Sequence, residues 1–254
     1  MDLCEKKAGY DQRHPWESSR IGALMDILMN DALLGRQVMV LDVGCGDGFV
    51  SRELHKTRRF NSITGVDTYL SGQQMAELSS QCAEITYYND YRQLLEKGYD
   101  LILMLDVIEH IENDKGFVSE IVSKYMATEG CILVTAPAFQ SLFGSHDRFL
   151  KHYRRYSRKQ LLSVLEGNNL ECLLSGYLFV FLLPIRLFFV LLEKIFRNRK
   201  DNESGVGAWG QGRVITRIFE RLLALDHRLA IYFTRRGVMI PGLTVWALCK
   251  KPQS

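Results

Sequence analysis

The sequence predicts an α/β protein built on an open, mostly parallel sheet. From residue 38 onward, apolar runs of strand length alternate with segments of helical periodicity. This alternation is typical of right-handed β-α-β units, in which a helix returns the chain to the start of the next parallel strand. The first apolar run, 38–43, leads into glycines at positions 44, 46 and 48 before helical periodicity resumes. A strand, a glycine turn and a helix in this order are typical of a nucleotide-type cofactor site.

The remaining elements follow from the same patterns. We expect strands at 38–43, 62–66, 85–88, 101–105, 131–135, 170–176 and 244–249. We expect helices from a cap at Ser18 or Ser19 to about Asn30, at 49–56, 73–78, 91–97 and 115–125, and after a capping box formed by Ser157 and Gln160. At 254 residues, the chain has room for one well-buried domain with an insertion.

Composition restricts the class of protein. A formal net charge of +3 is too small to indicate nucleic-acid binding, and the basic residues concentrate in the second half, from 146 to 200. The six cysteines are scattered without a C-x-x-C pair, which predicts reduced thiols and no zinc site. The polar first 20 residues do not resemble a secretory signal peptide. We therefore expect a cytoplasmic protein.

The glycine spacing indicates which cofactor the turn receives. The dinucleotide pattern is G-x-G-x-x-G, whereas this chain reads G-x-G-x-G and has the bulky Phe49 at the third dinucleotide position. An NAD-dependent oxidoreductase is therefore disfavoured. Asp67 follows the second strand, where its two oxygens could accept from both ribose hydroxyls, and Asp90 follows the third, beside Tyr91, where it could accept from an adenine amino group. The alternative for either aspartate is a helix N-cap.

The segment Asp42 to Gly48, with Asp67 after the next strand, resembles class I S-adenosylmethionine-dependent methyltransferases. The resemblance implies a Rossmann-like, seven-stranded, mostly parallel sheet with an antiparallel edge hairpin. It divides the chain into a helical cap (1–36), a cofactor-binding core (37–176), a hydrophobic and basic helical insertion (177–242) and the last core strand (243–254). The implied S-adenosylmethionine site comprises Arg20, Asp42, Gly44, Cys45, Gly46, Gly48, Asp67, Thr68, Asp90, Tyr91, Leu105 and Asp106.

The end of the fourth strand resembles one branch of this family. Asp106, Glu109 and His110 fall within one helical turn, as in the ubiquinone-pathway O-methyltransferases. That resemblance implies a divalent metal such as Mg2+ held by these three residues, which would lower the pKa of an acceptor hydroxyl. The alternative is that Asp106 caps the following helix while Glu109 and His110 hold a loop.

Two further stretches, 14–20 and 146–156, resemble bacterial methyltransferases associated with envelope lipids and polysaccharides. Arg20 could pair with the methionine carboxylate of the cofactor, and Trp16 could close over the site. His146, His152 and His110 are the candidate catalytic groups, because an imidazole is suited to take a proton from an attacking hydroxyl. Arg154 and Arg155 would either face an anionic substrate or hold the loop.

The insertion contains the most apolar stretch, 177–196, which Pro184 and Arg186 interrupt at its centre. This predicts two short interfacial helices or a lid over a greasy substrate instead of a membrane span. A glycine-rich stretch, 201–212, separates it from an amphipathic, arginine-rich helix at 213–236. Plain burial of the apolar helices is the alternative.

The resemblance implies a methyltransferase. The segment at Asp106 and the apolar insertion favour a small-molecule or lipid-linked acceptor, with oxygen as the preferred acceptor atom. No Asn-Pro-Pro-aromatic motif is present, so a nucleic-acid substrate is not expected. The insertion, through 177–236, would contact the inner face of the membrane peripherally. A catalytically silent, membrane-associated scaffold that keeps this fold is the alternative from another class.

Overall fold

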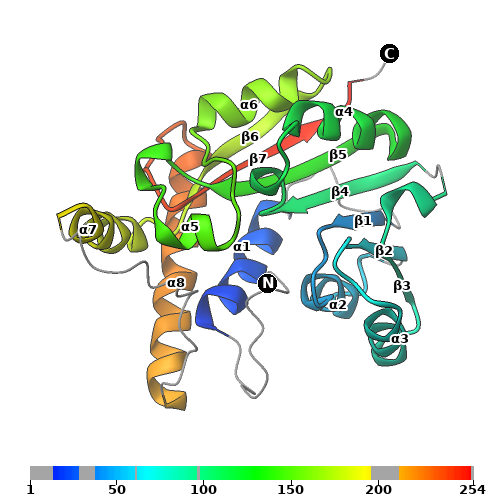
Figure 1. Ribbon diagram of the computed structural model, residues 1–254, viewed down its shortest axis with the longest axis horizontal. Coiled ribbons are helices and arrows are strands. Elements are labelled where there is room, and N and C mark those ends of the chain that lie inside the picture. The colour runs from blue at the N-terminus through cyan, green and yellow to red at the C-terminus, as the bar shows by residue number, and fades with distance from the viewer. Residues whose placement is uncertain (1–13, 29–37, 61, 96–97, 196–211, 253–254) are drawn as a thin grey trace.

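The protein is built on a seven-stranded sheet with the strand order β3-β2-β1-β4-β5-β7-β6 (Figure 1). The computed structural model describes residues 14–28, 38–60, 62–95, 98–195 and 212–252. β7 runs antiparallel to both β5 and β6, and the other neighbouring pairs are parallel. The predicted fold class is therefore confirmed, including the antiparallel edge. The strands are β1 Met39–Val43, β2 Ser62–Val66, β3 Ile85–Tyr88, β4 Tyr99–Leu105, β5 Met126–Pro137, β6 Glu171–Leu178 and β7 Thr244–Lys250.

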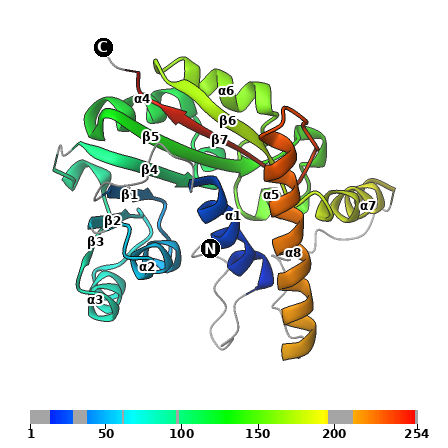
Figure 2. The same cartoon turned by 180° about the vertical axis from the view of Figure 1, so that it is seen from behind.

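Helices cover both faces of the sheet (Figures 1 and 2). One face packs against α4 (Asp114–Tyr125) and α6 (Arg158–Glu166), and the other against α1 (Pro15–Leu28), α2 (Phe49–Lys56), α3 (Gly72–Gln81) and α8 (Arg213–Thr234). β4 shows the arrangement, because Leu101 and Leu103 point into one layer and Ile102 and Met104 into the other. Burial on both faces explains why the central strands read as continuous apolar runs. The remaining elements are α5 (Ser145–Phe149), α7 (Leu182–Ile195) and the 3-10 turns η3 (Tyr91–Gln93), η4 (Ile108–His110) and η5 (Gln140–Leu142).

Helix boundaries depart from the expectations in two places. α1 begins at Pro15, so Ser18 and Ser19 lie inside the helix and neither caps it; the expected end near Asn30 lies outside the described residues. The helix expected at 91–97 is only the single turn η3, which ends at Gln93, and 96–97 lie outside the described residues. The capping box of Ser157 and Gln160 is confirmed at the start of α6.

The insertion contributes two helices to the described structure. α7 is one helix where two short ones were expected, because Pro184 is its third residue, a position whose backbone N–H needs no partner within the helix. The stretch 201–211 lies outside the described residues. No helix within the described part of the chain is both long and apolar enough to cross a bilayer.

α8 is held against the core by polar and close backbone contacts. The buried His227 ring lies 3.3 Å from Ser19 Oγ and 3.2 Å from Asp26 Oδ2, both on α1. Asp226 accepts hydrogen bonds from the N–H groups of Val180 and Phe181, which follow β6. At Gly176 in β6, a Cβ atom would lie 2.6 Å from Thr234 Oγ1. Glycine at 176 therefore permits the close approach of α8.

We expect Gly176→Ala to lower the free energy of unfolding by about 1–3 kcal/mol, because the new methyl group would collide with Thr234. The double variant Gly176→Ala/Thr234→Ala should be less destabilised, by about 1 kcal/mol or more, than the sum of the losses in the two single variants. Urea denaturation of the four proteins measures both effects. Gly72→Ala, where the new Cβ meets no atom within 4 Å, is the control; strict additivity of the two changes would contradict the proposed contact.

Candidate functional site

The glycine loop between β1 and α2 is a tight backbone turn. Gly44, Gly46 and Gly48 all have positive φ, at 73°, 54° and 68°. The N–H groups of Gly44 and Cys45 donate to the carbonyl of Val66, at 2.7 and 3.2 Å, which joins the loop to the end of β2. A Cβ at Gly44 would lie 2.4 Å from Val107 Cγ2. The loop conformation therefore requires glycine, both for φ and for space.

Asp67 fixes the loop from the neighbouring strand. Its Oδ2 accepts from Gly46 N–H at 3.0 Å, and its Oδ1 accepts from Tyr69 N–H at 2.9 Å. The side chain is partly exposed and Thr68 is exposed. Each carboxylate oxygen accepts one bond here and retains a further lone pair. The sequence prediction that Asp67 and the glycine loop belong to one site is consistent with this contact.

Asp42 and Cys45 are directed into the protein interior. Asp42 is buried and accepts a 2.6 Å hydrogen bond from Ser51 Oγ, which joins β1 to the first turns of α2. Burial raises the pKa of Asp42 to about 6. Burial likewise raises the pKa of the Cys45 thiol, whose Sγ would lie 2.9 Å from a Cβ placed at Gly65. Both side chains support the loop from within.

Arg20 and Asp106 meet at the end of β4. Arg20 Nη1 lies 2.9 Å from Asp106 Oδ2, and Arg20 Nη2 donates to Thr135 Oγ1 at 3.3 Å. Thr135 Oγ1 also donates to Asp106 Oδ1 at 2.9 Å. Asp106 has a positive φ of 56°, a conformation that is uncommon for a residue with a Cβ and that clusters at functional sites. Two segments that are distant in sequence therefore hold Asp106 in place: α1 through Arg20 and β5 through Thr135.

The residues after β3 have structural contacts. Asp90 caps η3 by accepting from Arg92 N–H, and it forms an ion pair with the Arg92 side chain at 2.8 Å. The hydrogen bonds from Arg92 lower the pKa of Asp90. The Tyr91 hydroxyl lies 3.2 Å from Glu120 Oε2, and its ring packs edge-on against Phe117, so this side chain faces α4. Asp90 is therefore an N-cap residue, which is the alternative that the sequence left open.

A second group forms beyond Asp106. Ligand-type atoms of Glu109, His110 and His152 all lie within 4.8 Å of one another, and the two imidazole rings pack edge-on at 4.6 Å. Glu109 is completely buried, and neither of its carboxyl oxygens has a hydrogen-bond partner among the residues that the structure describes. Burial, and then the charge of Asp106, raises the pKa of Glu109 well above its ordinary value. We call these three residues the acceptor cluster; Asp106, expected beside Glu109 and His110, contacts Arg20 instead.

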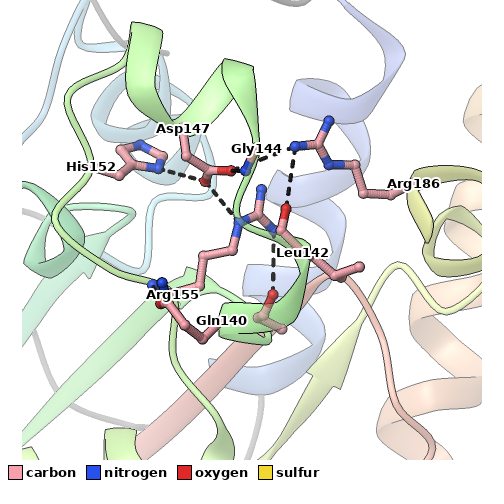
Figure 3. A network of polar contacts seen from close by, with 8 residues as sticks. Gln140, Leu142, Gly144, Asp147, His152, Arg155 and Arg186 are labelled. Atoms are coloured by element: carbon pink, nitrogen blue, oxygen red, sulfur yellow. Dashed lines mark hydrogen bonds and ion pairs between the residues drawn. The ribbon is translucent and has the colours of Figure 1, made fainter. Parts of the chain in front are cut away.

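A buried ion network holds His152 in this cluster (Figure 3). Asp147 Oδ1 lies 3.0 Å from His152 Nδ1 and accepts from Arg155 Nε at 2.7 Å. Its other oxygen accepts from Gly144 N–H at 2.9 Å and lies 3.5 Å from Arg186 Nη2 of α7. Burial opposes ionisation, but the bonds from His152 and Arg155 hold the pKa of Asp147 well below its ordinary range. Since Nδ1 of His152 faces Asp147, Nε2 is the ring nitrogen left for another partner.

The other predicted residues of this loop have different environments. His146, in α5, is partly buried, its pKa is lowered by burial, and it is outside the acceptor cluster. Arg154 pairs with Asp114 at 3.1 Å and donates to Glu112 O at 2.7 Å. Arg155 is buried against Asp147. Both arginines therefore hold the loop, which is the second of the two predicted alternatives.

Sequence reasoning missed three residues of the site. Thr135 is the last residue of a predicted strand, and this strand pairs with the one that precedes Asp106. Its position at a strand end could have identified it as a site residue. Asp147 lies inside the quoted stretch 146–156, but its burial could not be inferred from a run rich in charges. Arg186 served only as an argument against a membrane span. Its partner lies 39 residues away in sequence, and only the fold brings them together.

The strand order and the glycine loop are those of the α/β class of proteins in which ligands bind outside the carboxyl ends of the parallel strands. The methyltransferase domain family matches residues 16–175, which is more than half of the chain. The chain belongs to this family and is an S-adenosylmethionine-dependent methyltransferase.

The chain is also similar to individual methyltransferases. Malonyl-[acyl-carrier protein] O-methyltransferase of Bacillus cereus is 23% identical over 252 residues, covering 90% of this chain and 93% of its own. Ubiquinone biosynthesis O-methyltransferase of Rickettsia bellii is 26% identical over 148 residues, covering 52% and 61%. The structure of the plantazolicin methyltransferase BamL, in complex with a triazolic desmethylPZN analog and SAH, has a TM-score of 0.57 at 15% identity and covers 93% and 86%, which shows the shared fold.

We expect Asp147→Asn to lower the free energy of unfolding by about 3–5 kcal/mol at neutral pH, because it leaves buried arginine charge unmatched. The folded-state pKa of Asp147 is depressed. Its stabilising contribution is therefore complete above roughly pH 5 and is lost only as the pH falls through the folded-state pKa. The difference in the free energy of unfolding between wild type and Asp147→Asn should therefore decrease only in strongly acidic solution.

Denaturation with urea across a pH series measures this difference. Asp90→Asn is the matched control, because the same substitution there changes an exposed ion pair with Arg92 and preserves an N-cap residue. Equal effects of the two substitutions would contradict the structural role given to Asp147.

Proposed function

We propose that the protein transfers a methyl group from S-adenosylmethionine to an oxygen atom of a small or lipid-linked acceptor. The observation that carries the proposal is the contact of Asp67 with the glycine loop, which presents a fixed carboxylate beside backbone N–H groups. The match along 90% of the chain to an O-methyltransferase whose substrate is attached to a carrier protein supports oxygen as the acceptor atom. A catalytically silent scaffold receives no such support.

For the cofactor, we propose that Gly44 to Gly48 receive the methionine part and that the free lone pairs of Asp67 accept from the ribose hydroxyls. In this proposal Asp106 accepts from the methionine ammonium and Arg20 donates to the methionine carboxylate, which is supported by the opposite charges of the two side chains, 2.9 Å apart. Asp90 retains acceptor capacity for the adenine amino group. The other proposed cofactor positions are Asp42, Cys45, Thr68, Tyr91 and Leu105, of which Asp42 and Cys45 act by supporting the loop.

On the acceptor side, we propose His152 as the general base. The acceptor oxygen attacks the methyl carbon in line with sulfur, the carbon–sulfur bond breaks, and S-adenosylhomocysteine leaves. The acceptor's proton passes to Nε2 of His152, while Asp147 holds Nδ1 and stabilises the resulting imidazolium. His110 packs edge-on against this ring and keeps it facing the acceptor.

The family resemblance also implied a metal, which the donor atoms allow us to test. Mg2+ prefers oxygen ligands in octahedral geometry, whereas the acceptor cluster offers two imidazoles and one carboxylate. The set expected for Mg2+ lacks Asp106, which pairs with Arg20. The residues therefore do not fit Mg2+. A nitrogen-preferring ion such as Zn2+ fits the donor set better, and no step of the proposed mechanism depends on it.

We place this activity in the cytoplasm, at the inner face of the membrane. The cysteines that the structure describes are all free thiols, which suits a reducing compartment. The exposed apolar side chains of α7 favour a hydrophobic acceptor and do not suit a nucleic acid.

We expect Asp67→Ala to weaken S-adenosylmethionine binding by about 10- to 150-fold, since it removes a charged acceptor from the ribose and frees Gly46 N–H. Isothermal calorimetry measures the change. Glu77→Ala, on the exposed side of α3, should bind as wild type does. If wild type fails to bind the cofactor, the enzyme proposal is wrong.

We expect His152→Ala to lower methyl transfer from labelled S-adenosylmethionine into a lipid extract by about 10²- to 10⁴-fold, with unchanged cofactor affinity. His146→Ala is the matched control, because it removes a histidine of the same loop that is outside the cluster. Dialysis against Zn2+ separates the two roles of the cluster. If wild type retains Zn2+ and His152→Ala does not, the cluster binds a metal; if wild type retains no Zn2+, His152 acts as the base. Equal activity of the two variants would contradict the assignment.

A further inference from the structure

α7 and the outer side of α8 expose an unusual amount of apolar surface. Both helices lie at the end of the molecule opposite α3 (Figures 1 and 2). On α7 the exposed apolar side chains are Ile185, Leu187, Phe188, Phe189, Leu191 and Ile195. On α8 they are Val214, Ile215, Ile218, Phe219, Leu222, Leu225, Leu229 and Tyr232; all except Val214 and Phe219 form the row that we call the apolar stripe. Scattered exposed apolar residues are normal, but contiguous helix faces of this kind indicate a binding surface.

The spacing on α8 shows that this face is distinct from the one that packs on the protein. Leu223, His227, Ala230, Ile231 and Thr234 are buried and form the inner face. The exposed apolar side chains recur three or four residues apart along a separate stripe of the same helix. The stripe therefore adds nothing to the protein's own core.

Arginines border the stripe on α8. Arg217, Arg221, Arg228 and Arg235 are exposed and recur at intervals of four and seven residues, which places them in one row along the helix. At 100° per residue, this row lies between the apolar stripe and the buried Ile231. On that border Arg228 Nε lies 3.7 Å from Asp26 Oδ2 of α1 and Arg235 donates to Asp26 O at 2.8 Å. An apolar face with a basic border is the pattern of helices that lie in the interface of an anionic membrane.

α7 is fixed with its apolar side outward. Arg186 reaches inward to Asp147 at 3.5 Å and donates to Leu142 O at 3.3 Å. Val190, one helical turn further on, is buried on the same side. These contacts keep Phe188 and Phe189 exposed, where either ring would be stabilised by transfer into acyl chains.

We propose that the outer faces of α7 and α8 dock the protein on the surface of an anionic lipid bilayer. The stripe enters the boundary between headgroups and acyl chains, and the arginine row meets the headgroup charge. Since no helix in the described residues is suited to cross a bilayer, attachment through this surface is peripheral. A second copy of the chain is the less suitable occupant, because a two-fold contact would bring two arginine rows into one interface.

Docking of this kind would place the acceptor cluster near the lipid. Arg186 connects α7 to Asp147, and Asp147 holds His152. An acceptor embedded in the membrane would thus approach the site along α7. This consequence rests on the proposed function, but the docking surface itself does not.

The test is co-sedimentation of the full chain with phosphatidylcholine vesicles, with and without phosphatidylglycerol. We expect wild type to bind the anionic vesicles, and Leu222→Glu and Phe188→Glu each to weaken binding on the order of tenfold. Arg217→Gln should weaken binding to anionic vesicles about fivefold and leave binding to neutral vesicles unchanged. Leu95→Glu is the matched control, because Leu95 is also an exposed leucine but lies after η3, outside both helices.

Circular dichroism and urea denaturation of the same variants verify that they are folded, and neither measurement depends on the proposed function. The proposal is overturned if wild type does not sediment with anionic vesicles, or if Leu222→Glu and Leu95→Glu bind equally well. It is also overturned if light scattering shows a dimer that Leu222→Glu separates, since a second copy would then cover the surface.

Discussion

A carboxylate that is removed from water is stable only if its charge is matched, and Asp147 meets this condition through Arg155, His152 and, at longer range, Arg186. These partners come from the loop after β5 and from α7. Matching the charge therefore fixes three things at once: the path of the loop, the attachment of the apolar helix, and the orientation of the imidazole. The acceptor side of the site depends on this single buried charge, and its form is set by electrostatics more than by packing.

The glycine loop, which we propose as the cofactor side, depends on backbone geometry instead, and this explains why its turn could be predicted. A turn that requires positive φ at three positions can be written only with glycine or similar residues, so Gly44, Gly46 and Gly48 are visible in the sequence. Asp67 is visible for a related reason, because parallel strands place the residues after them at one edge. The strands were found within a few residues of their ends, since burial on both faces leaves long apolar runs.

The acceptor side could be predicted only in part, because its contacts join residues far apart in sequence. His152 was identified as a candidate, but its partners Glu109 and Asp147 could not be told from surface acids. Asp106 was assigned to a metal because it is near Glu109 in sequence, whereas the chain reverses there and Arg20 reaches it from α1. At 91–97 the helical pattern was misleading, because packing of Tyr91 and Leu94 on the core fixes a single turn.

The two sides meet at the end of β4, and the conformation of Asp106 explains how. A positive φ of 56° turns the chain sharply, so that η4 begins two residues later with Glu109 and His110 on a different course from the strand. Asp106 stays with Arg20 and Thr135, while Glu109 enters the acceptor cluster. Methyl transfer requires donor and acceptor to lie in line, on opposite sides of the moving carbon. In the proposed mechanism, a strand end that directs Asp106 to the donor and Glu109 to the acceptor would supply that arrangement. The hydrogen bonds between Thr135 and Asp106 stabilise the strained backbone at this point.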